Sequence, residues 1–101
     1  MNVVERITQK IYPEKWAALE ELDKRYNEVE SRLGFPAKKR YRCIIGGHDL
    51  NTLIIERQWD SLALMETAYE KTIVDQEYQD LVQESAAIIK SAQSEVYMPL
   101  P

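Results

Sequence analysis

The chain has 101 residues, of which 45% are hydrophobic and 30% charged, a composition typical of one globular domain covering residues 1–101. Its formal net charge of −4 disfavours nucleic acid and anionic membranes as general partners. A single cysteine, Cys43, and a single histidine, His48, exclude an internal disulfide, a cysteine zinc cluster and most Ser-His-Asp arrangements. The start lacks a basic leader with a long apolar run, and no apolar run exceeds four residues. We therefore expect a cytoplasmic protein without a membrane segment.

The first third of the chain predicts a strand followed by an amphipathic helix. Residues Val3–Ile11 are rich in β-branched side chains, which favours a strand. Pro13 suits the first turn of a helix, and Gly34 suits its C-terminal end. Between them, apolar side chains recur every three or four residues and mark the buried face: Trp16, Leu19, Leu22, Tyr26, Val29 and Leu33.

The middle of the chain predicts a β-hairpin. Residues 38–45 and 51–59 both have strand composition, and a turn cluster separates them, Gly46-Gly47-His48-Asp49. Two strands joined by a short glycine-containing loop are typical of an antiparallel pair.

The last third predicts a second helical region and a closing strand. Asp60 or Ser61 suits an N-cap, and Asp75 suits the cap of a second segment after the pattern breaks at residues 73–75. One bent helix and two separate helices both fit this interruption. Residues 92–98 have strand composition. The apolar positions of the two segments are Leu62, Met65, Ala68 and Tyr69, then Tyr78, Leu81, Val82, Ala86 and Ile89.

The resulting element order is β-α-β-β-α-β. This order is typical of the ferredoxin-like α+β fold, a four-stranded antiparallel sheet with two helices on one face. The predicted strands are partly apolar and partly charged on both faces, whereas an isolated sheet of this kind alternates cleanly. We therefore expect a homodimer that buries the open sheet face against a second copy; a mixed but solvent-exposed face is the alternative. Strand charges then form cross-strand or cross-dimer pairs rather than a catalytic cluster: Glu5, Arg6, Arg42, Glu56 and Arg57.

Three segments carry a resemblance to a known superfamily. They are LIIERQWDSL at residues 53–62, DQEYQDL at residues 75–81, and the closing segment Glu95-Val96-Tyr97. Together with the element order, they resemble the dimeric α/β-barrel superfamily, which holds the antibiotic-biosynthesis monooxygenase-like and NIPSNAP-like domains. The resemblance implies a pocket between the sheet and the helices, and activities that include cofactor-free oxygenases, isomerases and haem-degrading oxygenases.

The haem-degrading branch fits this sequence poorly. That branch pairs an Asn on the first strand and a Trp at the end of the third strand with a His on the second helix. Trp59 could match the Trp and Asn2 loosely the Asn, but no His occurs between Asp60 and Lys90. We therefore expect no haem.

Seven residues are candidates for the site that the resemblance implies. His48, Arg42 and Tyr41 are the candidate catalytic polar groups, since imidazole titrates near neutral pH. The candidate ligand-binding residues are aromatic: Trp16, Trp59, Tyr69 and Tyr78. A solvated loop histidine and plain core aromatics are the alternatives. Cys43, within the predicted second strand, is expected to be a small buried hydrophobe.

Other kinds of site find little support. The basic run at residues 38–42 and the element order are shared with RNA-recognition domains, but the centres of the first and third strands lack aromatics for base stacking. Gly46-Gly47 lacks the context of a phosphate loop, and no metal-ligand spacing occurs. We therefore expect no nucleic acid, no metal and no cofactor.

Three classes of function remain. We favour a protein that binds a small apolar or amphipathic molecule between sheet and helices. The alternatives are a cofactor-independent monooxygenase or isomerase using the same pocket, and a structural or assembly homodimer without a ligand.

Overall fold

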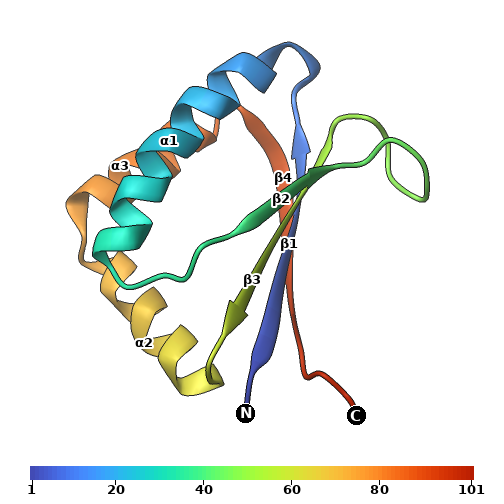
Figure 1. Ribbon diagram of the computed structural model, residues 1–101. Helices are drawn as coiled ribbons and strands as arrows, with labels where there is room; N and C mark the ends of the chain where they lie inside the picture. Colours follow the sequence, from blue (N-terminus) through green and yellow to red (C-terminus); the bar gives the residue numbers. More distant parts are fainter.

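The computed structural model describes residues 1–101 as one sheet with helices on a single face (Figure 1). The strands are β1 (Val3–Ile11), β2 (Lys39–Arg42), β3 (Thr52–Trp59) and β4 (Ile89–Tyr97). The helices are α1 (Trp16–Arg32), α2 (Leu62–Ile73) and α3 (Gln76–Ser85), and a 3-10 turn at Pro13–Lys15 precedes α1.

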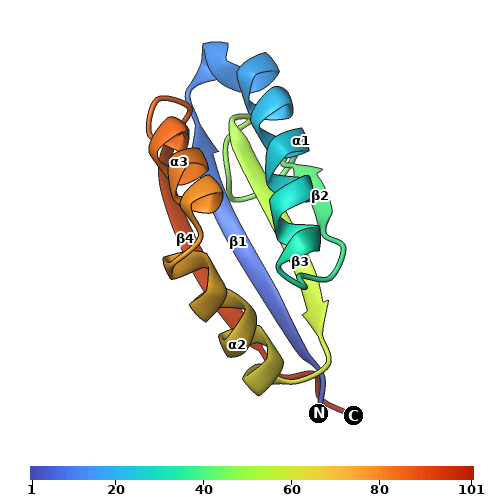
Figure 2. The same cartoon turned by 90° about the vertical axis from the view of Figure 1, so that its left-hand side faces the viewer.

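The sheet order is β2-β3-β1-β4, and each neighbouring pair of strands is antiparallel. In the central strand β1, Glu5 lies opposite Arg57 of β3 and opposite Val96 of β4. Figure 2 shows α1 lying over the sheet with α2 and α3 beside it, so that the opposite face has no helical cover. The predicted ferredoxin-like α+β fold is therefore confirmed. The second copy of a dimeric barrel stays a prediction.

Helix α1 begins and ends close to the predicted positions. Gly34 adopts a φ of +89°, a left-handed conformation that glycine takes at little cost, and Phe35 N–H donates to the carbonyl of Glu30. These two features end the helix and turn the chain toward β2. Leu22 and Val29 of the predicted apolar face are buried in the hydrophobic core.

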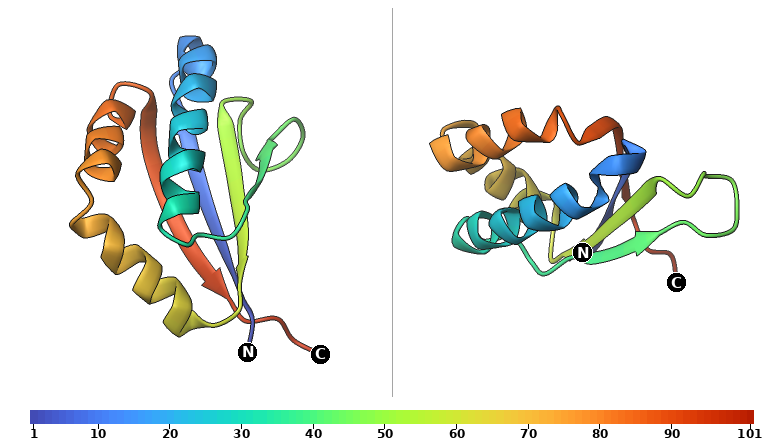
Figure 3. Two further views of the ribbon diagram at one scale, coloured as in Figure 1. Left: turned by 60° about the vertical axis from the view of Figure 1, so that its left-hand side comes forward. Right: turned by 90° about the horizontal axis from the view of Figure 1, so that it is seen from above.

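The second helical region consists of two helices. Asp75 accepts a hydrogen bond from the backbone N–H of Tyr78 at 2.9 Å and caps α3, while Ser61 caps α2 through Leu64 N–H at 3.1 Å. Figure 3 shows α2 and α3 meeting at an angle, so that together they curve over one edge of the sheet. The predicted inward positions Leu62, Val82 and Ala86 are wrong, since all three are exposed.

The strand bounds also differ from the predicted ones. β2 covers only Lys39–Arg42, because the chain leaves the sheet at Cys43 and returns at Thr52; Ile44 and Ile45 are exposed. Cys43 is therefore not a buried strand residue: it is half-buried at the start of this loop, with Sγ 3.4 Å from the carbonyl oxygen of His48. The closing strand starts at Ile89 rather than at residue 92.

Alternation along the central strands sorts the side chains between the two faces. The helix-facing residues of β3 are Leu53, Ile55, Arg57 and Trp59, and those of β1 include Val3, Glu5 and Ile11; all seven are buried. Two members of this core-facing set, Glu5 and Arg57, carry charges. No helix has both the length and the apolar character that crossing a membrane requires.

Candidate functional site

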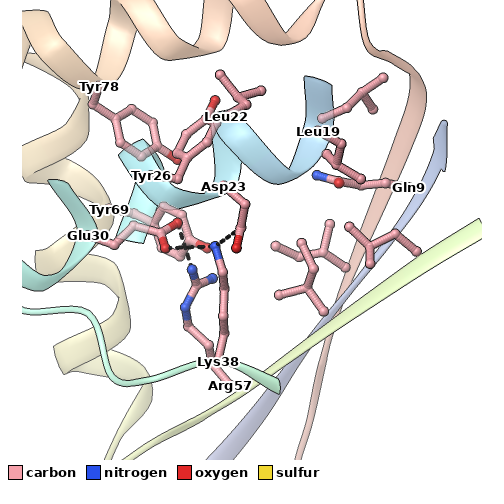
Figure 4. A pocket seen from close by; sticks show the side chains of 14 residues that line it. Gln9, Leu19, Leu22, Asp23, Tyr26, Glu30, Lys38, Arg57, Tyr69 and Tyr78 are labelled. Atoms are coloured by element: carbon pink, nitrogen blue, oxygen red, sulfur yellow. Dashed lines mark hydrogen bonds and ion pairs between the residues drawn. The ribbon is translucent and has the colours of Figure 1, made fainter. Parts of the chain in front are cut away.

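A cavity of about 100 Å³ lies between the sheet and the helices (Figure 4). Nine of its 14 lining residues are hydrophobic. Leu19 and Leu22 of α1 form one wall, and Leu53 and Ile55 of β3 form the facing wall. The remaining lining residues are Ile7, Gln9, Asp23, Tyr26, Glu30, Lys38, Arg57, Tyr69, Tyr78 and Ile89. The cavity thus has apolar walls and a strongly polar end.

A network of charges adjoins the polar end and begins at Glu5, which lies behind the lining and is only 4% exposed. Its Oε1 accepts a hydrogen bond from the indole Nε1 of Trp59 at 3.0 Å, and its Oε2 accepts one from the hydroxyl of Tyr69. Arg57, 3% exposed, places NH1 3.6 Å from the same Oε1. A buried carboxylate needs such partners, because an unpaired charge in the core would cost several kcal/mol, on the order of 3–5.

A chain of ion pairs continues from Arg57 toward the surface. Arg57 NH2 lies 2.7 Å from Glu30 Oε2, and Glu30 Oε1 lies 3.1 Å from Lys38 Nζ. Lys38 Nζ also lies 2.6 Å from Asp23 Oδ1, and Arg40 NH1 lies 3.5 Å from Asp23 Oδ2. We call Glu5, Asp23, Glu30, Lys38, Arg40 and Arg57 the charged wall. Its carboxylates come from β1 and α1, and its cations come from β3, from β2 and from Lys38 just before β2.

Two tyrosines connect the charged wall with the cavity. Burial, followed by the hydrogen bond to Glu5, raises the pKa of Tyr69 well above its usual range. Burial, helped by neighbouring Tyr26 and the charge of Glu30, raises the pKa of Tyr78 to about 12. Both phenols therefore stay protonated at neutral pH. The sequence-predicted residues Tyr69 and Tyr78 lie together in the cavity lining.

Trp59 lies behind the cavity rather than in its lining. It is buried, and the centres of the Phe35 and Trp59 rings lie 5.2 Å apart in an edge-to-face arrangement. Phe35 packs in the same way on Tyr69 at 4.9 Å. Trp59 thereby fixes Glu5 and, through Phe35, supports Tyr69.

Trp16 and Arg42 lie elsewhere, in an open groove of about 430 Å³ between α1 and the edge strand β2. The Arg42 guanidinium carbon lies 4.0 Å from the centre of the Trp16 ring, and its Nε donates to the carbonyl oxygen of Leu50 at 2.6 Å. Tyr41 borders this groove and is half exposed. The structure brings these three residues together, but outside the cavity.

His48 lies apart from Arg42. It is exposed in the loop after β2, with Nδ1 3.4 Å from Lys10 Nζ, and it borders a shallow hollow on the open sheet face. Tyr41 borders that hollow as well as the groove. The three residues predicted as catalytic therefore do not converge on one enclosed space, and their roles stay predictions.

The charged wall is not predicted as a unit from the sequence. A signal for part of it exists: Arg57 shares its strand parity with Leu53, Ile55 and Trp59, and Glu5 shares its parity with Val3, which places both charges in the core. Nothing comparable marks Glu30 or Lys38, which meet only after the turn that follows α1. No group of three or more His, Cys, Asp or Glu side chains is arranged to hold a metal ion.

Neither a protein-family model nor a curated protein sequence matches the chain. Several solved structures do share its fold. A NIPSNAP family protein from Agrobacterium tumefaciens superposes with a TM-score of 0.81 at 20% identity, over 99% of this chain and 94% of that one. A NIPSNAP-like domain protein from Burkholderia xenovorans gives 0.81 at 15% identity, over 98% and 85%. An antibiotic biosynthesis monooxygenase gives 0.70 at 13% identity, over 98% and 99%. The resemblance seen in the sequence is thus confirmed as a shared fold.

Proposed function

We propose that this protein binds a small, largely apolar molecule in the cavity between the sheet and the helices. The observation that carries the proposal is the combination of apolar walls, such as Leu22 and Ile55, with a polar end at Tyr69 and Tyr78. Binding sites for small molecules are commonly apolar clefts with a few placed polar groups. An apolar cavity of about 150 Å³ holds a benzene molecule, so a cavity of about 100 Å³ suits a ring of no more than five carbons.

A titration with cyclopentanol, followed in the ¹H–¹³C methyl spectrum, tests this proposal. We expect saturable shifts at Leu19, Leu22 and Leu53, because their methyl groups line the cavity. Ile7→Phe places a larger side chain in the lining and should abolish the saturable shifts. The matched control Leu64→Phe changes an exposed residue of α2 and should leave them intact. Shifts that grow linearly everywhere, or that survive Ile7→Phe, would contradict the proposal.

A second candidate is an enzyme without a cofactor that uses the same cavity, a monooxygenase or an isomerase. The specific observation in its favour is the contact between the Tyr69 hydroxyl, which lines the cavity, and the buried Glu5 carboxylate. The shared fold with an antibiotic biosynthesis monooxygenase is consistent with it. Against it, Glu5 is already saturated by Tyr69, Trp59 and Arg57, and the raised pKa of Tyr69 disfavours loss of its proton.

Deuterium exchange at the α-carbon of cyclopentanone in D₂O tests the isomerase form, since that chemistry begins with proton abstraction beside a carbonyl. Enzymatic exchange that disappears in Tyr69→Phe would support catalysis. Exchange no faster than in buffer would leave the binding function as the better account.

We also propose that the protein forms a homodimer through the open sheet face. A structural or assembly role of this dimer, without a ligand, is the third candidate function. This face carries Val4, Ile54 and Tyr97 together with the paired charges Arg6 and Glu56, whose NH2 and Oε2 lie 3.6 Å apart. Figure 1 places no helix there, and the loop between β2 and β3 projects to the same side with exposed Ile44 and Ile45. A second copy would cover these apolar groups.

A further inference from the structure

We infer that the cavity selects a neutral molecule bearing one hydrogen-bonding group and rejects a carboxylate of the same shape. This inference rests on the proposed binding function and adds the chemical class of the ligand. It follows from the charge balance of the charged wall and from two neutral polar residues of the cavity lining, Gln9 and Tyr78, whose side chains have no hydrogen-bond partner in the protein.

Each cation of the charged wall already contacts a carboxylate of the protein. Lys38 Nζ contacts Asp23 at 2.6 Å and Glu30 at 3.1 Å, and Arg57 contacts Glu30 at 2.7 Å and Glu5 at 3.6 Å. The three carboxylates of the wall thus neutralise its three cations. Arg40 also contacts Glu20, a carboxylate outside the wall, through hydrogen bonds of 2.9 and 3.0 Å. A carboxylate ligand would find no free cation and would lie near Glu30 and Asp23, which also line the cavity.

Two cationic N–H groups in the wall lack a partner, but a ligand cannot reach either. The Nε atoms of Arg40 and Arg57 make no hydrogen bond and are inaccessible to solvent, and Arg40 does not line the cavity. The terminal nitrogens of the Arg57 guanidinium hold Glu5 and Glu30 and keep the side chain in place. An anion would have to displace one of these carboxylates to bind Arg57.

Two neutral polar groups in the lining remain available. The amide of Gln9 projects from β1 into the space beneath α1, and Tyr78 points from α3 toward the charged wall (Figure 4). No protein group hydrogen-bonds the Tyr78 hydroxyl, and its pKa of about 12 keeps it a donor at neutral pH. Gln9 offers both a donor and an acceptor. Because the two groups approach the cavity from opposite sides (Figure 4), a primary amide or an alcohol on a small ring can satisfy one of them, the Tyr78 hydroxyl, without adding charge.

The decisive comparison uses two probes that differ mainly in charge, cyclopentanecarboxamide and cyclopentanecarboxylate, in methyl and amide NMR titrations at neutral pH. We expect the carboxamide to bind at least about tenfold more tightly, because a buried unpaired charge costs more than a paired amide gains. Equal or tighter carboxylate binding at the cavity methyl groups would overturn the inference while leaving the binding function standing. If cyclopentanol binds and the carboxamide does not, the inference also fails. If no probe binds, both proposals fail.

Removal of a carboxylate from the charged wall should shift the binding preference toward the carboxylate probe. Glu30→Gln leaves Lys38 with one carboxylate and should move the carboxamide-to-carboxylate ratio toward the carboxylate by at least about fivefold. Asp23→Asn makes the same change at a less buried position and serves if Glu30→Gln fails to fold. The matched control Glu56→Gln removes one charge from the opposite sheet face and should leave the ratio unchanged. A ratio that stays constant in a folded Glu30→Gln or Asp23→Asn protein would overturn the inference.

Removal of the hydroxyl tests the polar end. Tyr78→Phe should weaken the carboxamide by at least about threefold, the loss of one hydrogen bond, and should leave the fold intact because the ring remains. Unchanged carboxamide affinity would contradict the assigned orientation.

Discussion

Trp59 donates its indole N–H to the carboxylate of Glu5 across 54 residues of sequence, and both side chains are buried. The two residues lie on neighbouring strands, since Val3 pairs with Trp59 and Glu5 pairs with Arg57. This contact fixes an acceptor at the position where Tyr69 and Arg57 also converge. The sheet core is therefore organised around a charge rather than around an apolar contact alone.

Loss of the Glu5 carboxylate should strongly destabilise the protein. Glu5→Ala leaves the Trp59 and Tyr69 donors unsatisfied and removes one of the two carboxylates of buried Arg57. We expect the free energy of unfolding to fall by about 3–5 kcal/mol in urea titrations. Glu56→Ala, which removes a partly exposed partner of Arg6, should cost about 1 kcal/mol or less. Similar losses in both variants would contradict the assigned importance of Glu5.

Phe35 should stabilise the folded protein through its edge-to-face contacts with neighbouring aromatic rings. Phe35→Leu keeps an apolar side chain but loses the edge-to-face contacts with Trp59 and Tyr69. We expect a loss of about 1–3 kcal/mol in the free energy of unfolding. The control Tyr12→Leu alters an exposed aromatic, and its effect should stay within about 0.5 kcal/mol. A Phe35→Leu protein as stable as this control would show that the aromatic cluster packs without net benefit.

The junction of α2 and α3 should respond to acid. The hydrogen bonds from Arg32, and then from the backbone N–H of Tyr78, hold the pKa of Asp75 below its usual range. A carboxyl whose pKa is lower in the folded state stabilises the fold above its unfolded-state pKa of about 3.9. That stabilisation is lost as the pH falls through the lower folded-state pKa.

Unfolding of the wild type and of Asp75→Asn between neutral pH and strongly acidic pH measures this effect. The variant should be less stable at neutral pH, and the difference should shrink as the pH falls. Arg32→Gln removes the largest cause of the shift and should reduce the same pH dependence. A stability difference between wild type and Asp75→Asn that is constant across this range would refute the assignment.

The proposed dimer can be tested by the mass of the protein in solution and by a substitution on the open sheet face. Sedimentation at micromolar concentration should give twice the chain mass of 11.8 kDa. Ile54→Lys places a charge on the open sheet face and should shift the protein to the monomer, whereas Leu64→Lys on exposed α2 should not. A wild-type mass of 11.8 kDa would contradict the dimer.

The fold was largely predictable because its local signals agree. Strand composition, the period of α1, Gly34 at its end and the caps at Ser61 and Asp75 all specify the same elements. The incorrect predictions concern features that tertiary packing determines, namely where a strand ends and which side of a helix is buried. The extent of β2 depends on where the chain leaves the sheet at Cys43, and the inward side of α2 and α3 depends on the angle between them.

The site was predictable only in part. Tyr69 and Tyr78 were identified as aromatic candidates, and both line the cavity. The pairing of Lys38 with Glu30 joins the segment before β2 to the polar side of α1, and no period in the sequence encodes it. The separation of Arg42 from His48 likewise follows from the two faces of the sheet, which neighbouring residues in a hairpin do not reveal.

The most direct test of the proposed binding function is a crystal structure of the protein soaked with cyclopentanecarboxamide. We expect electron density for the ring between Leu22 and Ile55, with the amide group near the Tyr78 hydroxyl. Density only at surface sites, with the lining side chains closed together in place of the cavity, would contradict it.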